Sequence, residues 1–278
     1  MSQTQTLRSL TLPGVFLLGA ALLVLVAGQA RAEQTLMNYK LDIASTYVFR
    51  GDDVHRSLYT KTKKDEEAFH VAPAAQPSLT FYGPTGISFN LWGSFAIQDR
   101  ELDKDTGYAG LSQHDEVDYT MSYGWENKLG GFNTGVVAYT YPVTAAGYSQ
   151  ELFFGWKLPL IEGVGPTITT YQDVVLATSY TSLAVSGGED FTWGLSVGLV
   201  KRGVHDVTAS LGAALGGGFS ISLNGSHRPR PDIHSDWSGN AYSDKGKYTS
   251  AHGNVGAIYP ATIGWVTLSY GGSVTDAP

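Results

Sequence analysis

The sequence predicts an all-β protein, an antiparallel transmembrane β-barrel of about twelve strands with short periplasmic turns and longer extracellular loops. Three observations lead to this fold class. The 278 residues include 34 Gly and 16 Tyr, and only 15% are charged, whereas soluble domains carry about 25%. Hydrophobic residues recur with a period of two, which is the period of a strand with two different faces. The connections between these segments are short and long in alternation, as in outer-membrane barrels.

Residues 1–32 have the parts of a secretory signal peptide. Arg8 lies in a basic start, an apolar run covers 15–27, and Ala-Arg-Ala at 30–32 is a small-x-small cleavage site. Cleavage there would leave 33–278 as the barrel domain, and the alternative is an uncleaved anchor helix. A bundle of membrane helices is not expected, because the mean hydropathy is only −0.08.

Four segments alternate regularly between apolar residues and polar or small ones, and each is expected to be a strand with one face of each kind. They are 85–99, 115–127, 151–158 and 190–200. Less regular strands are expected near 36–50, 71–82, 131–141, 166–173, 176–186, 206–215 and 219–226. One more is expected near the C-terminus, where 250–258 and 262–271 both have an extended pattern. Most segments are about as long as the 9–11 residues with which a tilted strand crosses a bilayer.

The connections predict which end of the barrel faces the periplasm. Tight turns are expected at 82–86, 127–131, 187–189 and 216–218, and long polar loops at 51–70, 99–114 and 227–247. Aromatic residues lie beside the short turns, which predicts a girdle at the inner membrane interface. They are Phe81, Tyr82, Tyr123, Trp125, Phe132, Trp156, Phe191, Trp193 and Phe219. A secreted β-sandwich is the alternative, since its strands also alternate.

Charged residues within the strands are expected to face the lumen, because an Arg or Lys facing lipid at mid-membrane costs about 2–4 kcal/mol. Strand parity then assigns seven charged residues to the pore lining: Lys40, Asp42, Arg50, Asp118, Glu126, Glu151 and Lys157. Acids outnumber bases among them, and the formal net charge of the chain is −7. Acidic rings favour cations in a channel. The sequence therefore predicts a passive channel for small hydrophilic solutes with a weak preference for cations.

Two other functions stay open at this point. Salt-bridged side chains, or an inward-folded loop 51–70, could close the lumen and leave a non-conducting barrel that serves as a binding or assembly partner. An outer-membrane hydrolase is the less favoured alternative. Its one motif, G-x-S-x-G at 194–198, lies inside an alternating strand, whereas a nucleophile elbow needs a strand-to-helix turn. We therefore expect no enzyme activity.

No cofactor or metal site is expected either. The chain has no Cys, which excludes disulfides, thiolate metal sites and Cys nucleophiles. Its seven His have no helical or hairpin ligand spacing, and the acidic stretch at 103–107 lacks the closing Glu of a calcium loop. The acidic balance argues against a nucleic-acid partner. The expected partners are outer-membrane lipid and small hydrophilic solutes or ions.

Several short motifs resemble the TorF-type porin family of Gram-negative outer-membrane proteins. They are Y-V-F-R-G at 47–51, Y-T-Y-P at 139–142 followed by Glu151, Asp118, and Y-Q-D at 171–173. The resemblance covers about 36–270 and implies a pore in the cell outer membrane of a Gram-negative bacterium, with no known substrate and no catalytic set. The chain departs from the family at its end, because Tyr270 is followed by Gly271–Pro278 instead of ending an aromatic-terminated strand.

Overall fold

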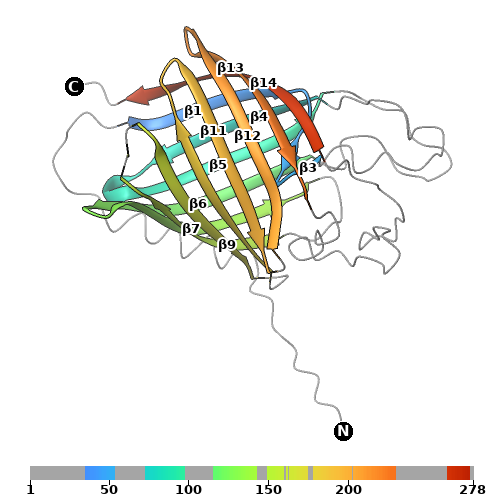
Figure 1. The fold of residues 1–278 in the computed structure, drawn as a ribbon. Helices are drawn as coiled ribbons and strands as arrows, with labels where there is room; N and C mark the ends of the chain where they lie inside the picture. The colour runs from blue at the N-terminus through green and yellow to red at the C-terminus, as the bar shows by residue number, and fades with distance from the viewer. Residues whose placement is uncertain are drawn as a thin grey trace, which may run out of the picture.

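The computed structural model describes residues 35–53, 73–97, 115–142, 149–159, 161, 163–174, 178–201, 203–229 and 262–275. Within these residues, twelve antiparallel strands close into one barrel in the order β1-β14-β13-β12-β11-β10-β9-β8-β7-β6-β5-β4 (Figure 1). The predicted all-β barrel and its twelve strands are confirmed, and a two-sheet sandwich is excluded. No helix in the described part of the chain is long and apolar enough to span a membrane. The expected signal peptide at 1–32 lies outside the described residues.

The twelve barrel strands lie close to their expected positions. They are β1 (Thr35–Ala44), β4 (Ala74–Tyr82), β5 (Ile87–Ala96), β6 (Glu116–Asn127), β7 (Gly130–Thr140), β8 (Ser149–Lys157), β9 (Gly165–Asp173), β10 (Ser179–Gly187), β11 (Phe191–Val200), β12 (Gly203–Gly216), β13 (Phe219–His227) and β14 (Thr262–Thr275). Two further strands, β2 (Val48–Phe49) and β3 (Asp52–Asp53), pair only with each other. A 3-10 turn, η1 (Pro84–Gly86), joins β4 to β5.

The strands turn their apolar side chains outward. On β8, Leu152 and Phe154 are exposed, whereas Glu151 and Phe153, which alternate with them, are buried. On the other side of the barrel, Leu223 is exposed on β13. Lipid would cover these outward side chains in a membrane, and a polar lumen lies behind them.

The two ends of the barrel differ as predicted. The turns after β4, β6, β10 and β12 are short, whereas 54–72, 98–114 and 230–261 lie between strands at the other end. By the usual arrangement of outer-membrane barrels, the short-turn end faces the periplasm. Trp125, Phe132 and Trp156 stack beside these turns, with ring centroids 5.4 and 5.9 Å apart. This row belongs to the predicted aromatic girdle.

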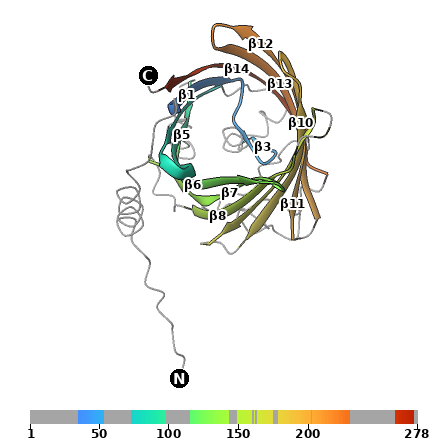
Figure 2. The same cartoon turned by 90° about the vertical axis from the view of Figure 1, so that its left-hand side faces the viewer.

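The sequence predicts a first strand that runs to residue 50, and this boundary is wrong. β1 ends at Ala44, and the chain then enters the lumen, where β3 lies inside the ring of barrel strands (Figure 2). Arg50 (φ 48°) and Gly51 (φ 80°) adopt left-handed conformations that a straight strand does not contain. At the other end of the sequence, the last strand is β14, and the second extended stretch at 250–258 lies outside the described residues.

Candidate functional site: the lumen and its inward hairpin

The chain that follows β1 forms a small hairpin inside the barrel. We call residues 45–53 the inward hairpin. Val48 pairs with Asp53 and Phe49 with Asp52, and Arg50 and Gly51 form the tip. The hairpin begins at Ser45, whose amide donates a hydrogen bond of 2.8 Å to the carbonyl of Val266 on β14. The hairpin therefore lies inside the ring of barrel strands, at the end opposite the short turns (Figure 2).

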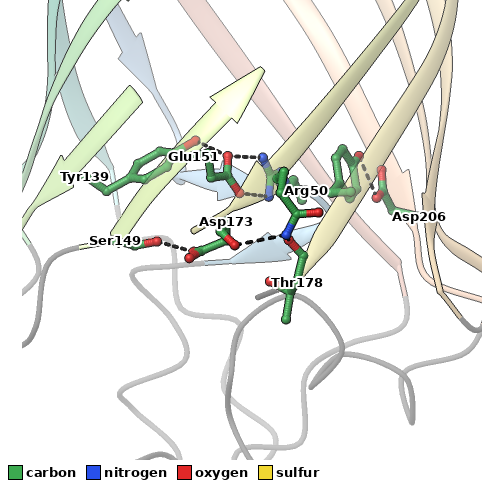
Figure 3. A network of polar contacts seen from close by, with 9 residues as sticks. Arg50, Tyr139, Ser149, Glu151, Asp173, Thr178 and Asp206 are labelled. Carbon is green, nitrogen blue, oxygen red and sulfur yellow. Dashed lines mark hydrogen bonds and ion pairs between the residues drawn. The ribbon is translucent and has the colours of Figure 1, made fainter. Parts of the chain in front are cut away.

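Arg50 forms a buried ion pair at the tip of this hairpin. Its two terminal nitrogens donate hydrogen bonds of 2.7 and 2.6 Å to the two carboxylate oxygens of Glu151 on β8. Both side chains are only 6% exposed. The hydroxyl of Tyr139 on β7 donates a third hydrogen bond, of 2.7 Å, to the same carboxylate (Figure 3). Bidentate pairs of this kind are among the strongest and most directional polar contacts in proteins.

Aromatic rings surround the Arg50 guanidinium. Its central carbon lies 4.7 Å from the ring centroid of Phe49, 4.8 Å from that of Tyr171 and 4.3 Å from that of Tyr180. Such ring faces attract a cation, and more strongly when water is excluded. Burial lowers the pKa of Arg50, but the hydrogen bonds and charge of Glu151 outweigh this effect, so the pKa is raised from its ordinary value. The guanidinium therefore stays charged inside the barrel.

The hairpin also contacts both flanks of the lumen. The Tyr47 hydroxyl donates a hydrogen bond of 3.0 Å to Glu116 on β6, and its ring lies 5.4 Å from that of Trp92 on β5. Burial and the neighbouring Glu116 raise the pKa of Tyr47 well above its usual value. On the opposite flank, a Cβ added to Gly51 would lie 2.9 Å from Cβ of Asp206 and 3.1 Å from Cγ of Arg228. The hairpin thus spans the lumen from β5 and β6 to β12 and β13.

The seven predicted pore-lining residues fall into three groups. Arg50, Asp118 and Glu151 lie in the buried cluster at the extracellular end. Lys40 and Asp42 form an ion pair of 2.8 Å along β1, where the Lys40 side chain is 54% exposed. Glu126 and Lys157 are exposed at the periplasmic rim, on either side of Gly131 in the strand register. The structure therefore places these residues on two separate levels of the lumen and at its rim.

The predicted pore lining omits several members of the extracellular cluster. They are Glu116, Tyr139, Asp173, Tyr180, His205, Asp206 and Arg228, of which all but the two tyrosines are at most 3% exposed. Asp173 accepts a hydrogen bond from Ser149, and Asp206 accepts one of 3.0 Å from the Tyr180 hydroxyl (Figure 3). Parity alone could have found Glu116, since it lies two residues before Asp118 on the same face. All of these residues lie where strands meet the extracellular side.

Below the hairpin, the lumen wall has a different character. Hydroxyl and amide side chains line β10 to β14, namely Ser182, Ser196, Ser210, Ser222, Asn224, Thr267 and Ser269, and all are partly exposed. Asn224 donates hydrogen bonds to Ser222 and Thr267 within this wall. In a filled barrel such inward side chains would be buried by their opposite neighbours. Their exposure shows that this part of the lumen is not packed with protein among the described residues.

The backbone around the candidate hydrolase motif does not have the geometry of a nucleophile elbow. The G-x-S-x-G motif lies inside β11, paired with β10 and β12, so no strand-to-helix turn forms around Ser196. Among the described residues, no group of three or more His, Asp or Glu is arranged to hold a metal ion. The long polar loops expected at 99–114 and 227–247 lie largely outside the described residues.

No family model and no curated protein matches the sequence. Among solved structures, the KdgM porin is similar with a TM-score of 0.48 and 8% identity, over 84% of this chain and 98% of that chain. A structure titled KdgM porin in complex with disordered oligogalacturonate has a TM-score of 0.46, 8% identity and coverage of 84% and 97%. The NanC porin has a TM-score of 0.47 and 7% identity, over 84% of this chain and 98% of that chain. At these identities the likeness concerns the fold alone.

A closed antiparallel barrel with apolar side chains outside and polar ones inside is the architecture of outer-membrane proteins. The protein is an outer-membrane β-barrel.

Proposed function

We propose that the protein is a passive channel for small hydrophilic solutes, with a weak preference for cations, and that the inward hairpin constricts its outer end. The contrast between the two levels of the lumen carries this proposal. The wall of β10 to β14 is polar and partly exposed, as a water-filled path requires. The extracellular level is closely packed around Arg50.

The cation preference rests on the charges that face the lumen. Among the described residues, the acids there outnumber the bases. The acids are Asp42, Glu116, Asp118, Glu126, Glu151, Asp173 and Asp206, and the bases are Lys40, Arg50, Lys157 and Arg228. Acidic side chains lining a pore attract cations and repel anions. Since Arg50 and Glu151 neutralise each other, the proposed preference rests on the other acids of the lumen, Asp173 and Asp206 among them.

Planar-bilayer recording of the refolded protein tests this function. Folding is first verified by heat-modifiable migration and a β-sheet circular dichroism spectrum. Discrete conductance steps, with a reversal potential in a KCl gradient that indicates K⁺ over Cl⁻, are the expected result. An anion-selective reversal potential would contradict the cation preference, and silence from verified, inserted protein would contradict the channel.

A non-conducting barrel is the second candidate, and the hairpin is the observation that favours it. Contacts from Tyr47, Arg50 and Gly51 reach β5, β6, β8, β9, β10, β12 and β13, so the outer end is bridged on several sides. The two functions predict different conductance for a variant whose hairpin is detached from the wall. In a channel, loosening the hairpin raises conductance, whereas a purely structural plug in a binding barrel leaves a folded variant silent.

A further inference from the structure

We propose that Arg50 occupies a guanidinium-binding site in the lumen wall, and that this site recognises solutes that carry a guanidinium group. The Arg50 site consists of Glu151, Tyr139, Tyr171 and Tyr180, all of them on the barrel strands β7 to β10. The inference deepens the proposed channel function and rests on it. Arg50 is then an intramolecular occupant that solutes replace.

The barrel wall positions the acceptor of this site. The Tyr139 hydroxyl on β7 donates a hydrogen bond of 2.7 Å to the Glu151 carboxylate, and the hairpin takes no part in this contact. Both carboxylate oxygens point at the two terminal nitrogens of Arg50, at 2.7 and 2.6 Å. A planar fork of two N–H donors matches this geometry, whereas a single ammonium group cannot bond both oxygens in the same parallel way.

Two wall aromatics add a second preference for guanidinium. The rings of Tyr171 and Tyr180 lie 4.8 and 4.3 Å from the guanidinium carbon, and their own centroids are 6.3 Å apart. A guanidinium is planar and weakly hydrated, so it stacks on such rings at a lower desolvation cost than a lysine-type ammonium. Phe49 also contacts Arg50, but it belongs to the hairpin and would leave with it. The site in the wall is complete without Phe49.

The occupant comes from an element that is separate from the barrel sheet. The inward hairpin has two strands of two residues each, and they pair only with each other. Arg50 has a φ of 48°, an uncommon conformation for a residue with a side chain. When the tip withdraws, Arg50 leaves with it, whereas the Glu151 carboxylate stays in the lumen wall without its cation. A guanidinium solute that enters the lumen can then form the same bonds.

Truncating Arg50 and adding the lost part of its side chain as a free solute tests the site. Arg50→Ala removes ethylguanidinium beyond Cβ, so N-ethylguanidinium is the probe and ethylammonium at equal ionic strength is its control. We expect N-ethylguanidinium to raise the thermal unfolding midpoint of Arg50→Ala saturably, and to bind about tenfold or more tightly than ethylammonium. The double variant Arg50→Ala/Glu151→Gln should lose this response, and Lys40→Ala should not acquire it.

Equal midpoint shifts from the two cations, or no shift in folded Arg50→Ala, would overturn the site. If Arg50→Ala does not fold, Arg50→Lys is used in its place. N-ethylguanidinium should then compete against the lysine and raise the single-channel open fraction, whereas ethylammonium should not. A midpoint shift without conductance in any variant would overturn the channel and leave the site standing. Conductance in the absence of any difference between N-ethylguanidinium and ethylammonium would overturn the site and leave the channel standing.

Discussion

The charged side chains are buried at the extracellular end of this barrel and exposed at its periplasmic end. At the extracellular end, Arg50 and Glu151 are each 6% exposed and are joined by two short hydrogen bonds. At the periplasmic rim, Glu126 and Lys157 are exposed to solvent. A buried charge depends on its partner because neither can be hydrated, whereas an exposed charge acts mainly through its field. The proposed function therefore assigns closure to the extracellular end, and only an adjustment of ion selectivity to the periplasmic end.

The largest difference between the two ends should come from removing one carboxylate at each. Glu151→Gln leaves the Arg50 charge buried without its anion, which costs about 3–5 kcal/mol against the docked hairpin. We expect a lower thermal midpoint together with a higher single-channel conductance or open fraction. Glu126→Gln at the exposed rim is the matched control and should change stability by less than about 0.5 kcal/mol. Equal effects of the two variants would contradict the comparison.

A second pair of variants separates the packing of the hairpin from its backbone conformation. Gly51→Ala adds a Cβ at φ 80° that meets Asp206 at 2.9 Å, and we expect a cost of about 2–4 kcal/mol from strain and overpacking together. Gly163 has a similar φ of 82° with nothing within 4 Å of an added Cβ. Gly163→Ala should therefore cost only the strain, about 1–2 kcal/mol. Urea titration of the folded barrels measures the free energy of unfolding of both variants. In bilayer recordings, only Gly51→Ala should raise conductance.

A third pair compares two tyrosine hydroxyls. Tyr47→Phe removes one hydrogen-bond donor to the buried Glu116, which should cost about 1–3 kcal/mol, because a buried carboxyl group loses one of its partners. Tyr82 accepts a hydrogen bond from Asn38 on the exposed periplasmic side, and Tyr82→Phe should cost less than about 0.5 kcal/mol. Thermal midpoints of the two variants provide the comparison. A larger loss in Tyr82→Phe would show that the hairpin is not held by Tyr47.

The smallest expected effect concerns ion selectivity. Glu126→Gln removes one exposed acid from the rim and should shift the reversal potential slightly toward anions, since exposed charges are screened by salt. Leu195→Ala changes a lipid-facing side chain on β11 and should leave the reversal potential unchanged. Both are measured in the same KCl gradient. A shift in Leu195→Ala as large as that in Glu126→Gln would contradict the assignment of the two strand faces.

Strand faces could be predicted from sequence because the direction of a side chain in a strand depends only on its position along the chain. Leu152 outward and Glu151 inward follow from parity alone, and the structure agrees. The inward hairpin could not be predicted in the same way. The motif Y-V-F-R-G has the composition of a continuing strand, and its departure from the wall depends on Glu151 and Asp206, which lie 101 and 156 positions further along the chain than Arg50.

The extracellular cluster shows the same limit. Parity marks Glu116 and Asp118 as lumen-facing, but it does not say which residues of other strands lie at the same height. The strand register and the hairpin together bring Glu116, Asp173 and Asp206 to one level, and the register is a property of the closed barrel.

Thiol labelling from each side of the membrane tests most directly whether the hairpin seals the outer end of an otherwise open lumen. The chain has no Cys, so Ser222→Cys places a single thiol in the hydroxyl wall below the hairpin. In the wild-type background, a membrane-impermeant maleimide should label this thiol rapidly from the periplasmic side and slowly from outside. Adding Arg50→Ala should make labelling from outside rapid. Equal rates from both sides in the wild-type background, or slow labelling from both sides in the double variant, would contradict the account.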